Sequence, residues 1–239
     1  MSQEFTITLY TLHPLEDESV MQRLWAFLDT PQVQPLRYDS IERVRRPFSP
    51  EAYQEAAALY RQEWELFVRG KKDGFVAFIS RERDGLSVWR FYLNAGALAG
   101  KKQARWMQWL FDLCAAFPAL YGLACSAVEH EIKHWIVEDL PGGGRVRRSC
   151  GASSAEFYRY LPGIYWLTLL GHELASAFAS CWPQIEGLAH VIHLAGGHVA
   201  IQLDTSVFSE DMEQRLLIER KIADILGAEF FSTAFGRTN

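Results

Sequence analysis

The sequence predicts an α+β protein in which antiparallel sheet units carry helices packed on one face. Short apolar runs of strand length alternate along the chain with longer segments that have helical spacing. Two pairs of these runs flank tight-turn sequences, Asp84-Gly85 and Ala195-Gly196-Gly197, which are typical of antiparallel hairpins. With 239 residues, of which 49% are hydrophobic, the chain can bury one large core or two small ones.

The first half of the chain is expected to begin with a strand over Phe5–Leu12, because apolar residues alternate there with threonines. Helical spacing then predicts a helix over Leu15–Leu28, whose acidic N-terminal residues favour the positive end of a helix. The following segment, Thr30–Pro50, is rich in proline and arginine, and we interpret it as an irregular connector.

A second helix is predicted to start at Ser49, a good capping residue followed by proline, and to end at about Arg69. The runs Gly74–Arg81 and Leu86–Asn94 then form the first predicted hairpin. A third helix is expected over Gly100–Phe117, because its large apolar residues share one helical face and a proline follows it.

The second half of the chain is expected to begin with a strand over Tyr121–Val128. The pattern over Glu129–Leu140 leaves its conformation open, with helix as one interpretation. Ile164–Leu170 is apolar apart from one threonine and is bounded by Pro-Gly and Gly, which predicts a short buried strand. A short helix over Gly171–Cys181 is expected to follow it.

The runs Leu188–Leu194 and His198–Asp204 form the second predicted hairpin. A last helix is predicted to start near Ser209 and to stop at Gly227. The residues expected to face inward from this helix are Leu216, Leu217, Ile222 and Leu226.

The order strand, helix, hairpin, helix therefore occurs twice along the chain. We expect a single domain over residues 1–239, and we hold as a hypothesis that it consists of two similar halves. These halves would cover residues 1–128 and 156–230, approximately, and would be joined by the glycine-rich loop Pro141-Gly142-Gly143-Gly144.

Composition excludes several classes of protein. No run of about 18 uncharged apolar residues is present, so no membrane span is expected, and the N-terminus does not resemble a secretory signal. The 4 cysteines are irregularly spaced, as buried thiols of a reducing cytoplasm would be. The net charge of -5 argues against a general nucleic-acid binder and is compatible with a basic protein partner.

The sharpest catalytic pattern is His130-Glu131-Ile132-Lys133-His134, which matches His-Glu-x-x-His. On a helix both imidazoles could bind one zinc ion while Glu131 activates water, with Glu156 as a conceivable third ligand. Against this, Lys133 places a cation beside the metal, and the polar surroundings favour a solvated helix. A zinc-dependent hydrolase is therefore the alternative hypothesis, and no cofactor or metal is expected.

A different hypothesis rests on one segment, which we call the signature segment. It reads Leu161-Pro162-Gly163-Ile164-Tyr165-Trp166-Leu167-Thr168-Leu169-Leu170-Gly171. It resembles a Pro-Gly-aliphatic-Tyr-Trp-Leu-x-x-aliphatic-Gly signature of bacterial immunity proteins from polymorphic-toxin systems. The most similar class is the immunity protein 52 family, which is encoded beside type VI secretion effectors. The preceding Glu156-Phe157-Tyr158 and the size and acidity of the chain are compatible with it.

This resemblance implies a non-enzymatic, cytoplasmic antidote that binds a cognate effector toxin, of a kind that often carries a restriction-endonuclease-like nuclease domain. It transfers no catalytic residues, and a homodimer stays open as a further assembly. A DNA-cleaving toxin needs a basic surface, which acidic residues of the antidote would complement. The candidate partner-binding residues are Glu129, Glu131, Glu138, Asp139, Glu210, Asp211 and Glu213. Tyr165 and Trp166 are expected in the core, so that the signature segment marks the fold.

Overall fold

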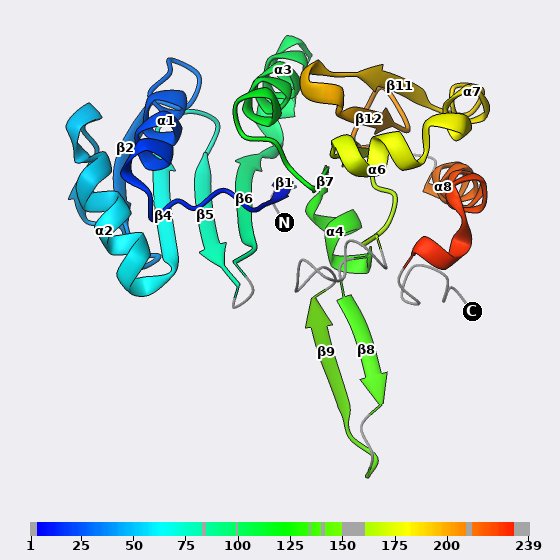
Figure 1. Cartoon of the computed structure of the whole chain (residues 1–239), viewed down its shortest axis with the longest axis horizontal. Coiled ribbons are helices and arrows are strands. Elements are labelled where there is room, and N and C mark those ends of the chain that lie inside the picture. The colour runs from blue at the N-terminus through cyan, green and yellow to red at the C-terminus, as the bar shows by residue number, and fades with distance from the viewer. Residues whose placement is uncertain are drawn as a thin grey trace. The chain divides into compact units, whose positions relative to one another are not determined.

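The computed structural model describes residues 4–82, 85–98, 100–133, 135–139, 142–149, 161–208 and 212–231. The chain forms two compact units, Met1–Ala119 and Leu120–Asn239. Each unit combines an antiparallel sheet with helices, which confirms the predicted α+β class (Figure 1). No helix within the described residues is both long enough and apolar enough to cross a membrane.

The first unit is built from a meandering sheet and the helices that cover it. Its strands are β1 (Glu4–Thr11), β2 (Pro35–Asp39), β3 (Arg46–Pro47), β4 (Glu65–Gly70), β5 (Val76–Arg81) and β6 (Ser87–Asn94). Its helices are α1 (Glu18–Leu28), α2 (Tyr53–Glu63) and α3 (Lys101–Ala116), with short 3-10 turns over Pro50–Ala52 and Ala95–Leu98. The strands pair antiparallel in the order β1-β6-β5-β4-β2-β3.

Burial alternates along β5, as expected when one face is covered, whereas every residue of β1 from Phe5 to Thr11 is buried. In β5, Ala77 and Ile79 are fully buried, whereas their neighbours in the strand are partly exposed. Helices α1 and α2 lie side by side (Figure 1). Helix α1 begins after Asp17, whose carboxylate accepts a 2.7 Å hydrogen bond from the backbone N–H of Ser19. This cap explains why the helix starts three residues later than the pattern predicts.

Two predictions for the first unit are wrong. The segment Thr30–Pro50 contains the paired strands β2 and β3, because the buried Tyr38 donates a 2.6 Å hydrogen bond to Glu55 and fixes the strand beside α2. The second helix ends at Glu63, where Trp64 adopts a left-handed conformation and the chain turns into β4. Both errors arise from strand pairing between distant segments, which local patterns do not report.

The second unit carries a smaller main sheet and a separate two-stranded sheet. Its strands are β7 (Tyr121–Ser126), β8 (Trp135–Asp139), β9 (Arg145–Ser149), β10 (Leu167–Leu170), β11 (His190–His193) and β12 (Val199–Gln202). Its α-helices are α4 (Ala127–Lys133), α6 (His172–Ala177), α7 (Trp182–Ile185) and α8 (Met212–Leu226), and 3-10 turns cover Ala179–Cys181, Ala195–Gly197 and Ala228–Phe230. The main sheet has the antiparallel order β11-β12-β10-β7, and β8 pairs with β9.

The signature segment lies in the core of the second unit. Every residue of Leu161–Gly171 is buried, which confirms the expectation that Tyr165 and Trp166 belong to the core. The strand itself is shorter than predicted and begins only at Leu167. In the last helix the prediction for Leu217 is wrong, because its side chain is exposed and charged residues face inward instead.

The internal duplication is not shown by the structure. In the first unit the first strand, β1, pairs with the last strand, β6, whereas in the second unit β7 pairs with β10, the next strand of its sheet. The boundary between the two units falls after Ala119, and Gly142–Gly144 lie between β8 and β9. The single domain with two similar halves therefore stays a prediction.

Gly70 provides a test of packing in the first unit. A Cβ atom at this position would lie 2.4 Å from the backbone oxygen of Val33 and 3.2 Å from Cβ of Phe75, so Gly70→Ala requires the backbone to shift. We expect it to lower the free energy of unfolding by about 1–3 kcal/mol. Gly96→Ala is the control, because nothing lies within 4 Å of its added Cβ. Urea denaturation measures both changes, and equal midpoints for the two variants would contradict this account of the packing.

Candidate functional site

Helix α4 has a reversed polarity: it buries charged side chains and exposes aliphatic ones, which is the opposite of what a helix on a protein surface usually does. Its charged residues Glu129 and Lys133 are four apart and share the face that is buried. Its aliphatic residues Val128 and Ile132 are also four apart, and they share the face that is exposed. The helix starts after Ser126, whose hydroxyl accepts a 3.1 Å hydrogen bond from the backbone N–H of Glu129.

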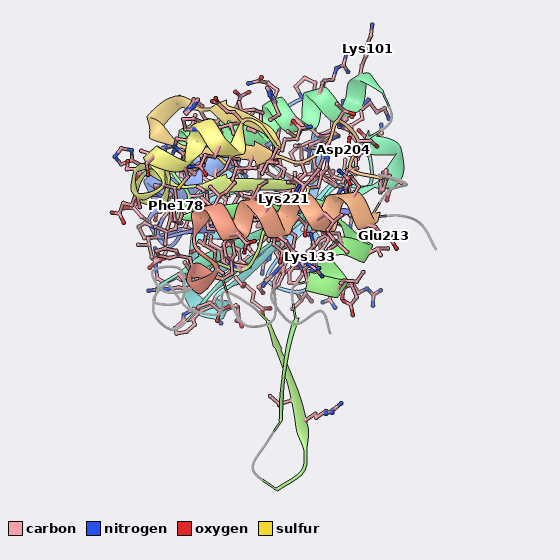
Figure 2. All side chains as sticks on the ribbon, turned by 90° about the vertical axis from the view of Figure 1, so that its right-hand side faces the viewer. Lys101, Lys133, Phe178, Asp204, Glu213 and Lys221 are labelled. Atoms are coloured by element: carbon pink, nitrogen blue, oxygen red, sulfur yellow. The ribbon has the colours of Figure 1, made fainter. Side chains whose placement is uncertain are left out.

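The inner face of α4 forms a buried ion cluster with α8. Lys133 Nζ donates to Glu129 Oε1 at 2.8 Å and to a carboxylate oxygen of Glu219 from α8. On the other side of Glu129, Nη1 of Arg215 lies 3.4 Å from Oε2. Figure 2 shows Lys133 below α8, with Glu213 and Lys221 along that helix. These four charged groups, Glu129, Lys133, Arg215 and Glu219, are called the ion cluster below.

Two backbone carbonyls accept further hydrogen bonds from Arg215, whose Nε is buried without a hydrogen-bond partner among the described residues. Its guanidinium donates to the carbonyl of Val207 at 3.1 Å and to the carbonyl of Ser206 at 2.8 Å. It also lies 3.6 Å from the carboxylate of Asp204. The cluster thus contains two cations and two carboxylates with further polar partners around them, which is the condition under which burial of charge is tolerated.

The ion cluster holds the signature segment directly. Glu129 Oε1 accepts a 2.9 Å hydrogen bond from the backbone N–H of Trp166, and Lys133 Nζ donates to the carbonyl of Ile164 at 3.0 Å. The ammonium group also lies 5.3 Å from the ring centroid of Tyr165, which is a cation–π contact. Two charged side chains of α4 therefore fix the extended backbone that precedes β10.

Burial changes the acidity of groups at this site. Removal from water raises the pKa of Glu219 to about 7, and the positive charge of Lys133 opposes this shift. Burial also raises the pKa of the Cys125 thiol well above its ordinary value, and the nearby Glu129 carboxylate adds to the effect. Cys125 is therefore an inert core thiol at neutral pH, because its thiolate is not populated.

The outer face of α4 is a compact apolar surface. The side chains of Val128 and Ile132 are 62% and 66% exposed, and Glu131 is exposed on the same helix. Exposed aliphatic residues at this spacing form a stripe that another protein can cover. The ion cluster holds the inner side of the helix, so the stripe is presented on a fixed element.

The predicted partner-binding residues fall into four groups. Glu131 and Glu213 are exposed, as a contact with a partner requires. Glu129 is corrected, because it is 1% exposed and its carboxylate holds the signature segment, so it offers no surface to a partner. Glu138 and Asp139 lie in β8, opposite Val146 and Arg145 of β9. Glu210 and Asp211 lie outside the described residues.

The His-Glu-x-x-His pattern is only partly covered by the structure. His130 and Glu131 lie in α4, which ends at Lys133, whereas His134 and the conceivable third ligand Glu156 lie outside the described residues. Within the described part of the chain, no group of three or more histidine, cysteine or acidic side chains is placed to hold a metal ion. Lys133 points away from any such site, because its ammonium group belongs to the ion cluster.

Sequence reasoning missed Lys133, Arg215 and Glu219 as members of one site. The signal that could have found them is a pair of oppositely charged residues four apart, Glu129 with Lys133 and Arg215 with Glu219. Such pairs are usually solvated salt bridges on a helix surface. Only the packing of α4 against α8 reveals that the two pairs face each other.

Comparisons with known proteins support the fold. No model of a known protein family matches the sequence, and no curated protein matches it. The structure is similar to a solved structure described as "Pseudomonas aeruginosa T6SS protein PA0821", with a TM-score of 0.61 and 17% sequence identity. The match covers 93% of this chain and 73% of that chain. The resemblance to the immunity protein 52 family is therefore not confirmed, whereas the fold is shared with a protein of a type VI secretion system.

Replacement of Lys133 tests the ion cluster. Lys133→Ala leaves two buried carboxylates without their shared cation, and we expect the free energy of unfolding to fall by about 3–5 kcal/mol. Lys221→Ala is the matched control, because Lys221 lies on the exposed side of α8 and should change stability by less than about 0.5 kcal/mol. Thermal and urea unfolding measure both. Similar stabilities for the two variants would show that the cluster does not hold the fold.

The raised pKa of Glu219 predicts a pH dependence of stability. Between its ordinary pKa of 4.5 and its folded pKa of about 7, the folded chain keeps a proton that the unfolded chain releases. The contribution of Glu219 to the free energy of unfolding is therefore fully present below pH 4.5, and it is lost as the pH rises to about 7. Urea unfolding of the native chain and of Glu219→Gln across this range measures it. We expect the stability difference between them to shift against the native chain as pH rises, and a constant difference would exclude this titration.

Proposed function

We propose that this chain is an immunity protein of a type VI secretion system, which binds and neutralises a cognate effector toxin in the cytoplasm. The most fitting toxin is a nuclease with a restriction-endonuclease-like domain. Two observations support the proposal. The fold is similar to that of a type VI secretion protein, and the signature segment resembles that of immunity proteins. In this proposal the chain is not an enzyme and needs no cofactor.

The single observation that carries the proposed mode of action is the reversed polarity of α4. A helix that served only the fold would bury Val128 and Ile132 and expose its charged residues. Here the aliphatic pair faces outward while Glu129 and Lys133 are buried. An outward apolar stripe lowers the free energy of the complex when a partner covers it, and it does nothing for the isolated chain.

Charge supports a basic partner. The chain has a net charge of -5, and Glu131 is exposed beside the aliphatic pair. A DNA-cleaving domain carries cations that contact phosphates, so an acidic antidote would be attracted to the same surface. Contact there would cover the DNA-binding side of the toxin, whereas contact elsewhere would hold the toxin in an inactive shape.

Substitution of the aliphatic pair tests this surface. The toxin domain encoded beside this gene should form a complex with the native chain, with a dissociation constant on the order of nanomolar. We expect Val128→Ser with Ile132→Ser to weaken binding at least about tenfold, because the complex loses buried apolar area. Leu36→Ser is the control, since Leu36 is an exposed aliphatic residue of β2 in the other unit. Calorimetry and size-exclusion chromatography provide the measurements.

The same experiment separates the proposal from its rivals. If a folded and active toxin forms no complex with the native chain, the pairing is wrong. If the complex forms but the double variant binds as tightly as the native chain, α4 is not the contact surface. The zinc-hydrolase alternative predicts stoichiometric zinc in the purified chain and loss of hydrolysis in Glu131→Gln.

A further inference from the structure

The first unit contains a pocket that the proposed function does not use. Its volume is about 630 Å³, which lies in the range of small-molecule sites. It lies between α3, the end of α1 and the turn that precedes β5. The lining residues that matter for its chemistry are Phe27, the cations Lys72, Lys102 and Arg105, and the acids Asp73 and Asp112.

The wall of this pocket is aromatic and rigid. Trp106 and Trp109 are both buried, and their rings meet at a centroid distance of 5.5 Å. Trp109 also contacts Phe27, at 5.4 Å between centroids, and Phe75 packs against both tryptophans. These buried rings fix Phe27, which is partly exposed and presents flat apolar area to the pocket at little cost in side-chain entropy.

The two acidic side chains that line the pocket already accept hydrogen bonds from neighbouring side chains. Asp73 accepts from Lys102 Nζ at 2.7 Å and from the indole N–H of Trp106 at 3.2 Å. Partial burial opposes ionisation of this carboxyl, but the hydrogen bonds from Lys102 and Trp106 outweigh it and lower the pKa. Asp112 accepts from the side-chain amide of Gln108 at 2.8 Å.

Some of the hydrogen-bond donors that line the pocket have no ion-pair or hydrogen-bond partner among the described residues. Within the described residues, Lys72 and Arg105 form no ion pair, whereas Lys102 is paired with Asp73. The side-chain nitrogens Nε2 of Gln32 and Nε1 of Trp109 are buried and have no hydrogen-bond partner there. Trp109 is only 5% exposed. These two nitrogens are closed to solvent, so the exposed cations Lys72 and Arg105 are the donors that a bound anion can reach.

We propose that this pocket binds a small organic anion with a flat aromatic body. The carboxylate or phosphate group of the ligand would be held by Lys72 and Arg105, and its ring would pack against the partly exposed Phe27, which Trp109 supports from behind. An anion is favoured because Lys72 and Arg105 are exposed at the pocket without an ion pair among the described residues, whereas Asp73 is already paired with Lys102. This proposal concerns the first unit alone and does not depend on the partner surface of α4.

Phenyl phosphate and benzoate are the probes for a calorimetric titration of the full chain. We expect saturable binding in about the millimolar range or tighter. Benzamide, which is neutral, and inorganic phosphate, which lacks the ring, should bind at least about tenfold more weakly. The double variant Lys72→Gln with Arg105→Gln should weaken binding of phenyl phosphate by a similar factor. Lys101→Gln is the matched control, because Lys101 is an exposed neighbour on α3 that does not line the pocket (Figure 2).

Several outcomes would overturn the proposal. They are the absence of saturable binding of both anions up to about 10 mM, binding of benzamide as tight as that of benzoate, and equal weakening by Lys101→Gln. Salt provides a second measurement on the unaltered chain, in case the double variant fails to fold. Affinity for phenyl phosphate should fall as salt rises, while weak binding of benzamide stays constant. A salt-independent affinity for phenyl phosphate would exclude the two cations as its site.

Discussion

The second unit depends on the contact between Lys133 and the two buried carboxylates of Glu129 and Glu219. This contact joins α4 to α8 and fixes the backbone of Ile164 and Trp166 through hydrogen bonds. A buried ion pair is not a strong source of stability by itself, because desolvation opposes it. The ion pair does restrict the packing, however, because a buried charged group is tolerated only in the few arrangements that place a partner of opposite charge or a hydrogen-bonding group beside it. The cluster therefore determines where the signature segment lies more than how stable the unit is.

Reversed polarity of α4 follows from the same cluster. Once Glu129 and Lys133 occupy the inner face, Val128 and Ile132, which precede them by one residue and lie about 100° around the helix, are turned away from it and are exposed. The helix thus links the fold to the proposed function. The buried side sets the position of the helix, and the outer side offers an apolar stripe next to Glu131. A signature segment that marks the fold is consistent with a partner surface that lies elsewhere on the unit.

The first unit uses a different kind of core. Its sheet packs through apolar and aromatic side chains, and the buried Trp106 and Trp109 continue this aromatic packing to Phe27, which is partly exposed. Phe27 lines the pocket together with Lys72 and Arg105. The two units therefore present different chemistry, an apolar stripe with an acidic residue on α4 and a cationic pocket beside α3. This division allows partner binding and ligand binding to be tested separately.

Local patterns are enough to predict the α+β class, the hairpins of β5 with β6 and of β11 with β12, and the burial of Tyr165 and Trp166, because apolar periodicity and turn residues act locally. Long-range packing is needed to place Tyr38 in a strand, to end α2 at Glu63 and to bury Glu129. Each of these depends on a partner far away in the chain. A charged pair four residues apart has the same sequence pattern on a solvated helix and in a buried cluster, and only the opposite helix distinguishes the two.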